Sequence, residues 1–215
     1  MDTPAALAFL SDQIPVKHQV LLPPVFRSAY NAVNALANDT PFLKVPSAIF
    51  NRGRMVTWAV DYAIENLIQS GRWNVDYRWA TFGSPKVTGK YIEIILPQSR
   101  MMISQISDPT RQPRNVGFRE NARVFNSPFL FKEMDEDRIT GRPSFLLVHG
   151  HQELSFLHIG IPHATRRYGY ICTSTNLLNL PHEVVAPGPP AEDTSFNDTM
   201  TLKDQIERWL KDHGG

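Results

Sequence analysis

The sequence is poor in cysteine and has no long apolar run, and both shortages limit what the protein can be. Cys172 is the single cysteine among 215 residues, so no disulfide can form within one chain. This favours a reducing, cytoplasmic setting. No stretch approaches the roughly 20 apolar residues that a membrane-spanning helix needs, and no basic and apolar leader is visible. We therefore expect a cytoplasmic protein with no membrane partner.

Excess charge of one sign is also missing, since the net charge is +1 at pH 7. The distribution is uneven, however. Residues 52–123 hold eleven Lys and Arg against six Asp and Glu, whereas the rest of the chain holds eleven against fifteen. A basic middle between acidic ends is typical of a protein with a polyanionic contact in its central part.

Familiar catalytic motifs are absent as well. The sequence contains no Gly-x-Ser-x-Gly nucleophile motif, no glycine-rich phosphate loop and no His-Glu-x-x-His pair. These absences remove the most recognisable hydrolases, nucleotide-binding enzymes and zinc proteases. They leave open whether the protein is an enzyme.

What the sequence does contain is seventeen prolines, which divide it into short elements. Pro15 is expected to end a first helix that starts at Thr3 and Pro4, and the pair Pro23-Pro24 to open a second that runs to about residue 38.

A third helix is expected over residues 47–70, with Ser47 as its cap and Gly71 as its stop. Its apolar side chains recur at helical spacing, at Val56, Val60, Ala63, Ile64, Leu67 and Ile68.

Strands are expected to follow. Residues 73–82 alternate apolar and polar side chains, which indicates a half-buried strand. Residues 91–96 and 100–106 form a first hairpin, and residues 145–149 and 154–161 a second, with its turn at residues 150–153. Residues 168–174 add another strand.

The fold class that follows is α+β, with N-terminal helices packed on a largely antiparallel sheet built from two hairpin regions. Residues 1–180 are expected to form one domain, helical over 1–72 and β-rich over 73–180. Residues 181–215 are expected to form a proline-rich tail with a short terminal helix at 202–211.

Histidines crowd residues 149–163, where four of the chain's seven lie. Side chains two apart on a strand share a face, so His149, His151 and Glu153 could converge on one divalent metal, with His158 joining from the returning strand. This would be the site of a metal-dependent hydrolase. If residues 150–153 form the turn, however, alternation fails at His151, and the histidines have ordinary structural roles.

A second metal alternative uses Asp76 and Glu93. Many metal-dependent nucleases hold magnesium with an acid on one strand and a Glu-x-Lys on the next. Here the helix, Asp76 and Glu93 come in that order, but Ile95 occupies the lysine position. Exposed acids on a sheet explain both carboxylates equally well.

Arginines form the third cluster, at Arg111, Arg114, Arg119 and Arg123, with Phe118 and Phe125 between them. Guanidinium groups bind phosphates, and aromatic rings stack on unpaired bases. The leading functional hypothesis is therefore a protein that contacts a polyanion, nucleic acid above all, through this arginine-rich loop.

A protein partner is the alternative of a different class. Trp73, Trp79 and Trp209 are anchors of the kind that interfaces use, and the tail from Pro181 could become ordered on binding. An inhibitor, or one partner of a two-protein system of the toxin–antitoxin kind, would have this character.

Overall fold

The computed structural model describes residues 3–82, 89–113, 119, 122–123, 126, 142–164, 169–181 and 204. Its helical elements are α1 (Thr3–Gln13), α2 (Val16–Gln19), α3 (Leu22–Asp39), the 3-10 helix η1 (Pro41–Lys44), α4 (Pro46–Ile49), α5 (Arg52–Gln69) and the 3-10 helix η4 (Leu177–Asn179). Its strands are β1 (Asp76–Thr81), β2 (Lys90–Ile95), β3 (Arg100–Gln105), β4 (Ser144–His149), β5 (Leu157–Pro162) and β6 (Tyr170–Thr173).

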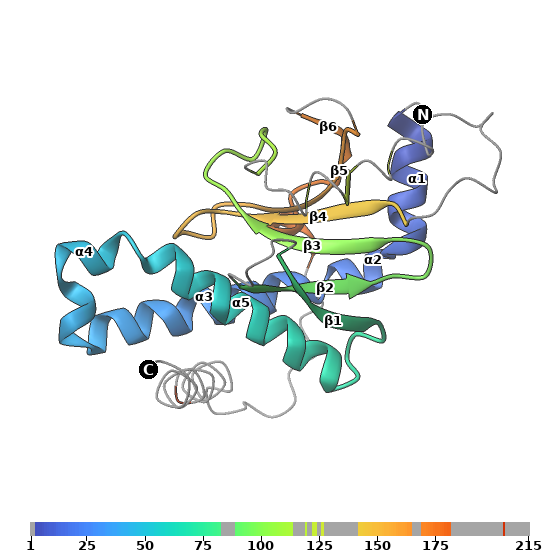
Figure 1. Ribbon diagram of the computed structural model, residues 1–215. Coiled ribbons are helices and arrows are strands. Elements are labelled where there is room, and N and C mark those ends of the chain that lie inside the picture. The colour runs from blue at the N-terminus through green and yellow to red at the C-terminus, as the bar shows by residue number, and fades with distance from the viewer. Residues whose placement is uncertain are drawn as a thin grey trace.

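These strands form one six-stranded sheet in the order β1-β2-β3-β4-β5-β6 (Figure 1). Four pairings are antiparallel, and β3 pairs with β4 in parallel. The expected α+β class and both hairpins, β2–β3 and β4–β5, are confirmed. The parallel pair arises where the chain leaves β3 at one end and returns to start β4 at the other.

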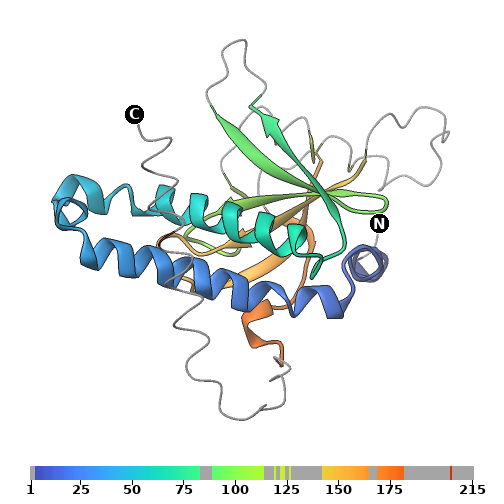
Figure 2. The ribbon, with the colours of Figure 1, turned by 90° about the horizontal axis from the view of Figure 1, so that it is seen from below.

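The α3–α5 hairpin packs lengthwise on one face of the sheet (Figure 2). Both helices bury an apolar stripe because their large side chains recur every three or four residues, as at Phe26, Tyr30 and Val33 on α3. Opposite them lie side chains that alternate along the strands, among them Ile92, Ile94, Met101, Phe145, Leu147, Leu157 and Ile159. Trp73, fully buried before β1, joins this core.

The expected third helix is wrong at its start, because α4 ends at Ile49 and α5 begins at Arg52. Ser47 lies inside α4 and caps nothing. The interruption comes from Asn51, whose side-chain amide donates to the carbonyl of Ser47 at 3.1 Å and so replaces a helical hydrogen bond. Gly71 does end α5, at a left-handed φ of 72°.

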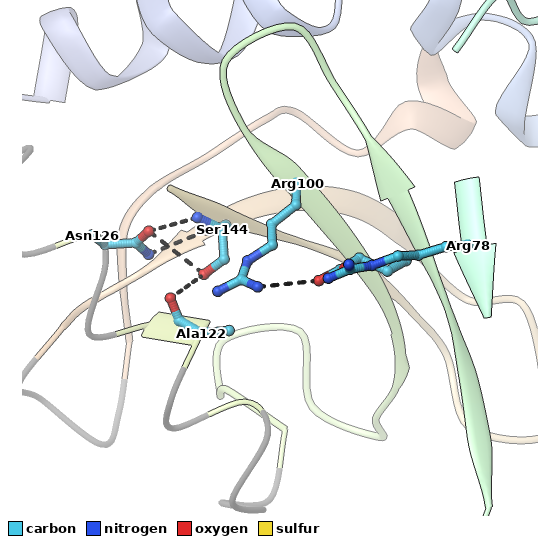
Figure 3. A network of polar contacts seen from close by, with 6 residues as sticks. Arg78, Arg100, Ala122, Asn126 and Ser144 are labelled. Atoms are coloured by element: carbon cyan, nitrogen blue, oxygen red, sulfur yellow. Dashed lines mark hydrogen bonds and ion pairs between the residues drawn. The ribbon is translucent and has the colours of Figure 1, made fainter. Parts of the chain in front are cut away.

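The face of the sheet opposite the helices holds an ion triad centred on a buried carboxylate. Glu93 on β2 is fully buried and accepts from Arg78 Nε at 2.5 Å and from Arg100 Nη1 at 3.3 Å (Figure 3). The three side chains come from three adjacent strands, so the triad ties β1, β2 and β3 together.

The same face carries a contact with the long β3–β4 connection. Asn126, which is buried, donates to the carbonyl of Ser144 at 3.2 Å and accepts from the Ser144 amide at 2.7 Å (Figure 3). It also donates to the carbonyl of Pro162 at 2.9 Å. One side chain thus satisfies three backbone groups where β4 begins and β5 ends.

Three further expectations have different outcomes. The described residues include no helix both long and apolar enough to cross a membrane. The tail and the terminal helix at 202–211 fall outside the described residues, apart from Asp204 in a helical turn. The division into a domain and a tail therefore stays a prediction.

We predict that Glu93→Gln lowers the free energy of unfolding by about 3 kcal/mol, because it leaves the mostly buried Arg100 without its carboxylate. Arg78→Gln should cost about 1 kcal/mol or less, since the Arg78 side chain is 64% exposed. Urea unfolding of both variants, followed by circular dichroism, makes the comparison. Equal losses of unfolding free energy in the two variants would contradict the explanation that buried Arg100 is the residue that needs the Glu93 carboxylate.

Candidate functional site

The histidine-rich stretch ends β4 and enters a tight turn at residues 150–155. A Cβ on Gly150 would lie 2.0 Å from the carbonyl oxygen of Glu153, so only glycine fits there. Gln152 adopts a left-handed φ of 64°, which is uncommon for a residue with a side chain. The sequence prediction of a turn at this place is therefore confirmed, and the observed turn requires glycine at residue 150.

His149, the last residue of β4, is buried between the sheet and α3. Its ring makes an edge contact with Phe26 at 5.1 Å between centroids, and its Nδ1 lies 2.7 Å from the hydroxyl of Tyr30. That hydroxyl donates its one hydrogen to the carbonyl of Gly150. We therefore assign the Nδ1–H tautomer to His149, which donates to Tyr30.

The protonation of His149 follows from its surroundings. Burial lowers its pKa to about 3, while the hydrogen bond with Gly150 opposes the shift. The imidazole is therefore neutral near pH 7. Burial likewise raises the pKa of Tyr30, so its hydroxyl keeps its proton. The pair connects α3 to the beginning of the turn without any buried charge.

His151 connects the same turn to α5. Its Nδ1 lies 3.2 Å from Gln105 Oε1, and a Cβ on Gly53 would lie 2.7 Å from the ring. The absence of a side chain at Gly53 thus lets the imidazole lie against the first turn of α5. Gln152 adds a longer contact, 3.4 Å from its Nε2 to the carbonyl of Ile49.

Beside this turn lies a cavity of about 480 Å³. Its wall combines α3, the first turn of α5 and the β4–β5 turn. Most of its side chains are polar, and they include Arg27, Asn31, Asn34, Arg52, Gln152 and Glu153. Ligand pockets in proteins commonly have volumes of about 300–1,000 Å³. The size and polarity of this cavity suit a small polar ligand.

Arg52 is the most informative of these residues. Its Nη2 donates to Asn34 Oδ1, and its buried Nε has no hydrogen-bond partner among the described residues. Within that part of the chain its guanidinium contacts no carboxylate. A neutral amide offsets only part of the free energy that it costs to remove a positive charge from water.

The four predicted metal ligands do not form a site. His149 faces the helices, whereas His158 lies on the opposite face of the sheet, because it pairs directly with Val148 on the neighbouring strand. His151 and Glu153 are exposed turn residues. Within the described residues no three His, Cys, Asp or Glu side chains are placed to hold a metal. The turn breaks the alternation on which the expected convergence depended.

His158 instead packs among aromatic rings. It stacks on Phe156 with centroids 5.5 Å apart and meets Tyr170 edge-on at 5.6 Å. Burial lowers its pKa, and its Nε2 has no hydrogen-bond partner in the described part of the chain. These residues line a second, more open cavity of about 610 Å³ at the β5–β6 edge.

The alternative acids lie on one face of the sheet but not as a metal pair. Asp76 pairs with Ile95 and Glu93 with Arg78, so both acids point away from the helices. Both carboxylate oxygens of Glu93 accept from arginines, one from Arg78 and the other from Arg100. A carboxylate held in this way serves to join strands rather than to bind magnesium.

The four arginines of the leading hypothesis occupy different environments. Arg111 is 70% exposed and pairs with Asp108 at 3.2 Å. Arg119 and Arg123 are half-buried, and burial lowers the pKa of Arg119 to about 10. Arg114 lies outside the described residues. Arg111 is thus the one of the three described arginines that is open to solvent.

The cavity residues on α3 were not predicted from the sequence as site residues. Arg27, Asn31 and Asn34 recur at intervals of four and three, which places them on one helical face, next to the buried stripe. Such a polar stripe is a signal, but exposed helical faces are ordinarily polar, so it has little specificity by itself.

Comparison with protein-family models, with curated proteins and with solved structures found no match to this chain. The class that the structure defines is therefore an α+β protein with a helical hairpin on one face of its sheet.

We predict that acid destabilises the protein through His149. Below its ordinary pKa of 6.5 the unfolded chain binds a proton at His149, whereas the folded protein does not until the pH nears 3. The contribution of the neutral ring to the free energy of unfolding is complete above pH 6.5. Below that pH the free energy of unfolding falls by about 1.4 kcal/mol for each pH unit. His149→Asn should lack this slope in urea unfolding between pH 7 and pH 4.

Two comparisons sharpen that measurement. Half-buried Asp61, whose pKa is raised to about 7 by burial, produces a slope of opposite sign in both proteins. The difference between wild type and variant therefore isolates His149. His151→Asn changes an exposed ring and should keep the wild-type slope. If His149→Asn also keeps it, the burial of a neutral His149 is not the cause.

Proposed function

We propose that this protein is a binding module that docks an acidic, amphipathic segment of a protein partner at the free end of its α3–α5 hairpin. The observation that carries the proposal is a group of exposed apolar side chains in the segment that joins the two helices. Phe42 is 70% exposed and Phe50 83% exposed, and Val45 and Ile49 are exposed between them.

The position of these side chains favours binding over a structural role. η1 and α4 lie at the end of the helical hairpin, away from the sheet (Figure 1). Neither η1 nor α4 contains a buried residue. Single exposed apolar residues are common on protein surfaces, but four within nine residues of a protruding end are typical of an interaction site.

The charge of this segment supports an acidic partner. Residues 40–60 contain Lys44, Arg52 and Arg54 and no Asp or Glu. A surface that combines exposed phenylalanine rings with a cationic segment is complementary to a segment in which acids flank apolar anchors. Charge complementarity of this kind guides association, and the buried aromatic anchors provide most of the affinity.

Nucleic acid is the competing occupant, since rings and cations also bind single strands. Two observations favour a protein. Val45 and Ile49 are aliphatic and offer no surface on which a base can stack. The arginine loop, proposed as the nucleic-acid contact through Arg111, Arg114, Arg119 and Arg123, has two half-buried members among the three that are described.

The test is selection of displayed random peptides on the full-length protein. We expect the enriched peptides to alternate Asp or Glu with Leu, Phe or Trp. Phe50→Ser should weaken their binding about 30-fold, the loss of one aromatic anchor, while the thermal midpoint stays unchanged because the ring is exposed.

The matched control is Val16→Ser, which removes a 60% exposed apolar side chain at the other end of the helical layer. It should leave peptide binding unchanged. Peptides without acidic residues, or equal losses in both variants, would reject the proposal. So would self-association of the protein that Phe50→Ser abolishes, because the occupant would then be a second copy. Salt-sensitive binding of single-stranded RNA or DNA, lost in the same variant, would assign the surface to nucleic acid instead.

A further inference from the structure

The cavity beside the β4–β5 turn collects hydrogen-bond donors from three directions. Arg27, Asn31 and Asn34 come from α3, Arg52 from the first turn of α5, and Gln152 from the turn. Donors that surround a space suit a tetrahedral anion, which accepts from several sides, better than a planar carboxylate.

Some of these donors already have partners, since Arg27 donates to the carbonyl of Leu178 and Gln152 to that of Ile49, both at 3.4 Å. Asn34 and Arg52 keep donors for a ligand. Asn34 uses its oxygen to accept from Arg52, which leaves its amide nitrogen to donate. The buried Nε of Arg52 has no partner among the described residues. Glu153 also lines the cavity but forms no ion pair with either arginine in that part of the chain.

The start of α5 adds to the positive potential. Asn51, which precedes α5, makes no side-chain hydrogen bond to the helix N-terminus because its amide is directed to Ser47. The N-terminal end of this 18-residue helix, which begins at Arg52, carries a partial positive charge.

From this arrangement we infer that the cavity binds a phosphate monoester that carries hydroxyl groups, such as a sugar phosphate. The phosphate lies between Arg52, Arg27 and the two asparagine amides. The exposed carboxylate of Glu153 accepts hydrogen bonds from the hydroxyl groups, and it would repel an anion without them. The cavity volume of about 480 Å³ admits a ligand of this size.

This site is separate from the docking surface at the end of the hairpin. It depends on Arg52 and the α3 face rather than on Phe42 or Phe50, and it needs no protein partner. Phe50→Ser should therefore leave phosphate binding intact. Arg52 contributes charge to both surfaces, so the separating variant is Asn31→Leu, which should weaken phosphate binding and leave peptide docking intact.

The experiment is calorimetric titration of the full-length protein with inorganic phosphate, ribose 5-phosphate and ribose. We expect ribose 5-phosphate to bind more tightly than inorganic phosphate, and ribose not to bind at up to about 10 mM. Arg52→Gln should weaken both phosphate ligands about tenfold or more, the effect of one charged hydrogen-bonding partner.

Three variants make the result specific. Glu153→Ala should weaken ribose 5-phosphate but not inorganic phosphate. Asn31→Leu, at an exposed position where we expect little effect on stability, should weaken both. Arg54→Gln removes an exposed cation that does not line the cavity and should change nothing.

The inference is overturned by any of four results: neither phosphate ligand binds, ribose binds as well as ribose 5-phosphate, Arg52→Gln and Asn31→Leu both bind like wild type, or Arg54→Gln loses as much affinity as Arg52→Gln. The last result would mean that the cation density of the surface, and not the cavity, attracts phosphate.

Discussion

The contact between α3 and the end of β4 holds the functional end of this molecule together. Tyr30 bonds at once to His149 and to the carbonyl of Gly150, within a ring of apolar side chains that includes Phe26. Because the imidazole is buried and neutral, the contact needs no counterion. It fixes where the β4–β5 turn leaves the sheet. The cavity walls depend on it, since Gln152 and Glu153 follow that point directly while Asn31 and Asn34 lie just beyond Tyr30 on the helix.

Buried polar groups are stabilised in different ways on the two faces of the sheet. On the helical face, polar groups are few and neutral, as with His149. On the other face, Glu93 is paired with two arginines and Asn126 satisfies three backbone groups. Ion pairs of this kind fix geometry more than they stabilise, because desolvation offsets most of their attraction. Most of the acids and histidines that the sequence suggested as catalytic or metal-binding residues instead make structural hydrogen bonds and ion pairs. The better candidates for ligand binding are the arginines and asparagines beside the turn.

Secondary structure was predictable where periodicity is strong. The apolar stripe of α5, the alternation along β1 and the hairpin β2–β3 all follow from side-chain spacing. The break between α4 and α5 was not predictable, since it depends on the amide of Asn51 choosing the carbonyl of Ser47. The candidate metal site failed for a related reason: spacing of two implies one face only on a continuous strand, and the backbone turns at Gly150.

The sequence by itself determined the class of the protein. Its apolar periodicities require amphipathic helices and half-buried strands, and burial of those faces leads to an α+β arrangement. Tertiary structure alone decided the order of the strands, the parallel β3–β4 pair and the convergence of Arg27, Arg52 and Gln152 around one cavity. Those residues come from three separate segments, and no local pattern encodes their distance. Exposure was likewise decided only in three dimensions: Phe26 and Phe50 are the same residue type in helical surroundings, yet one is buried under the sheet and the other is left in solvent because the hairpin extends beyond it.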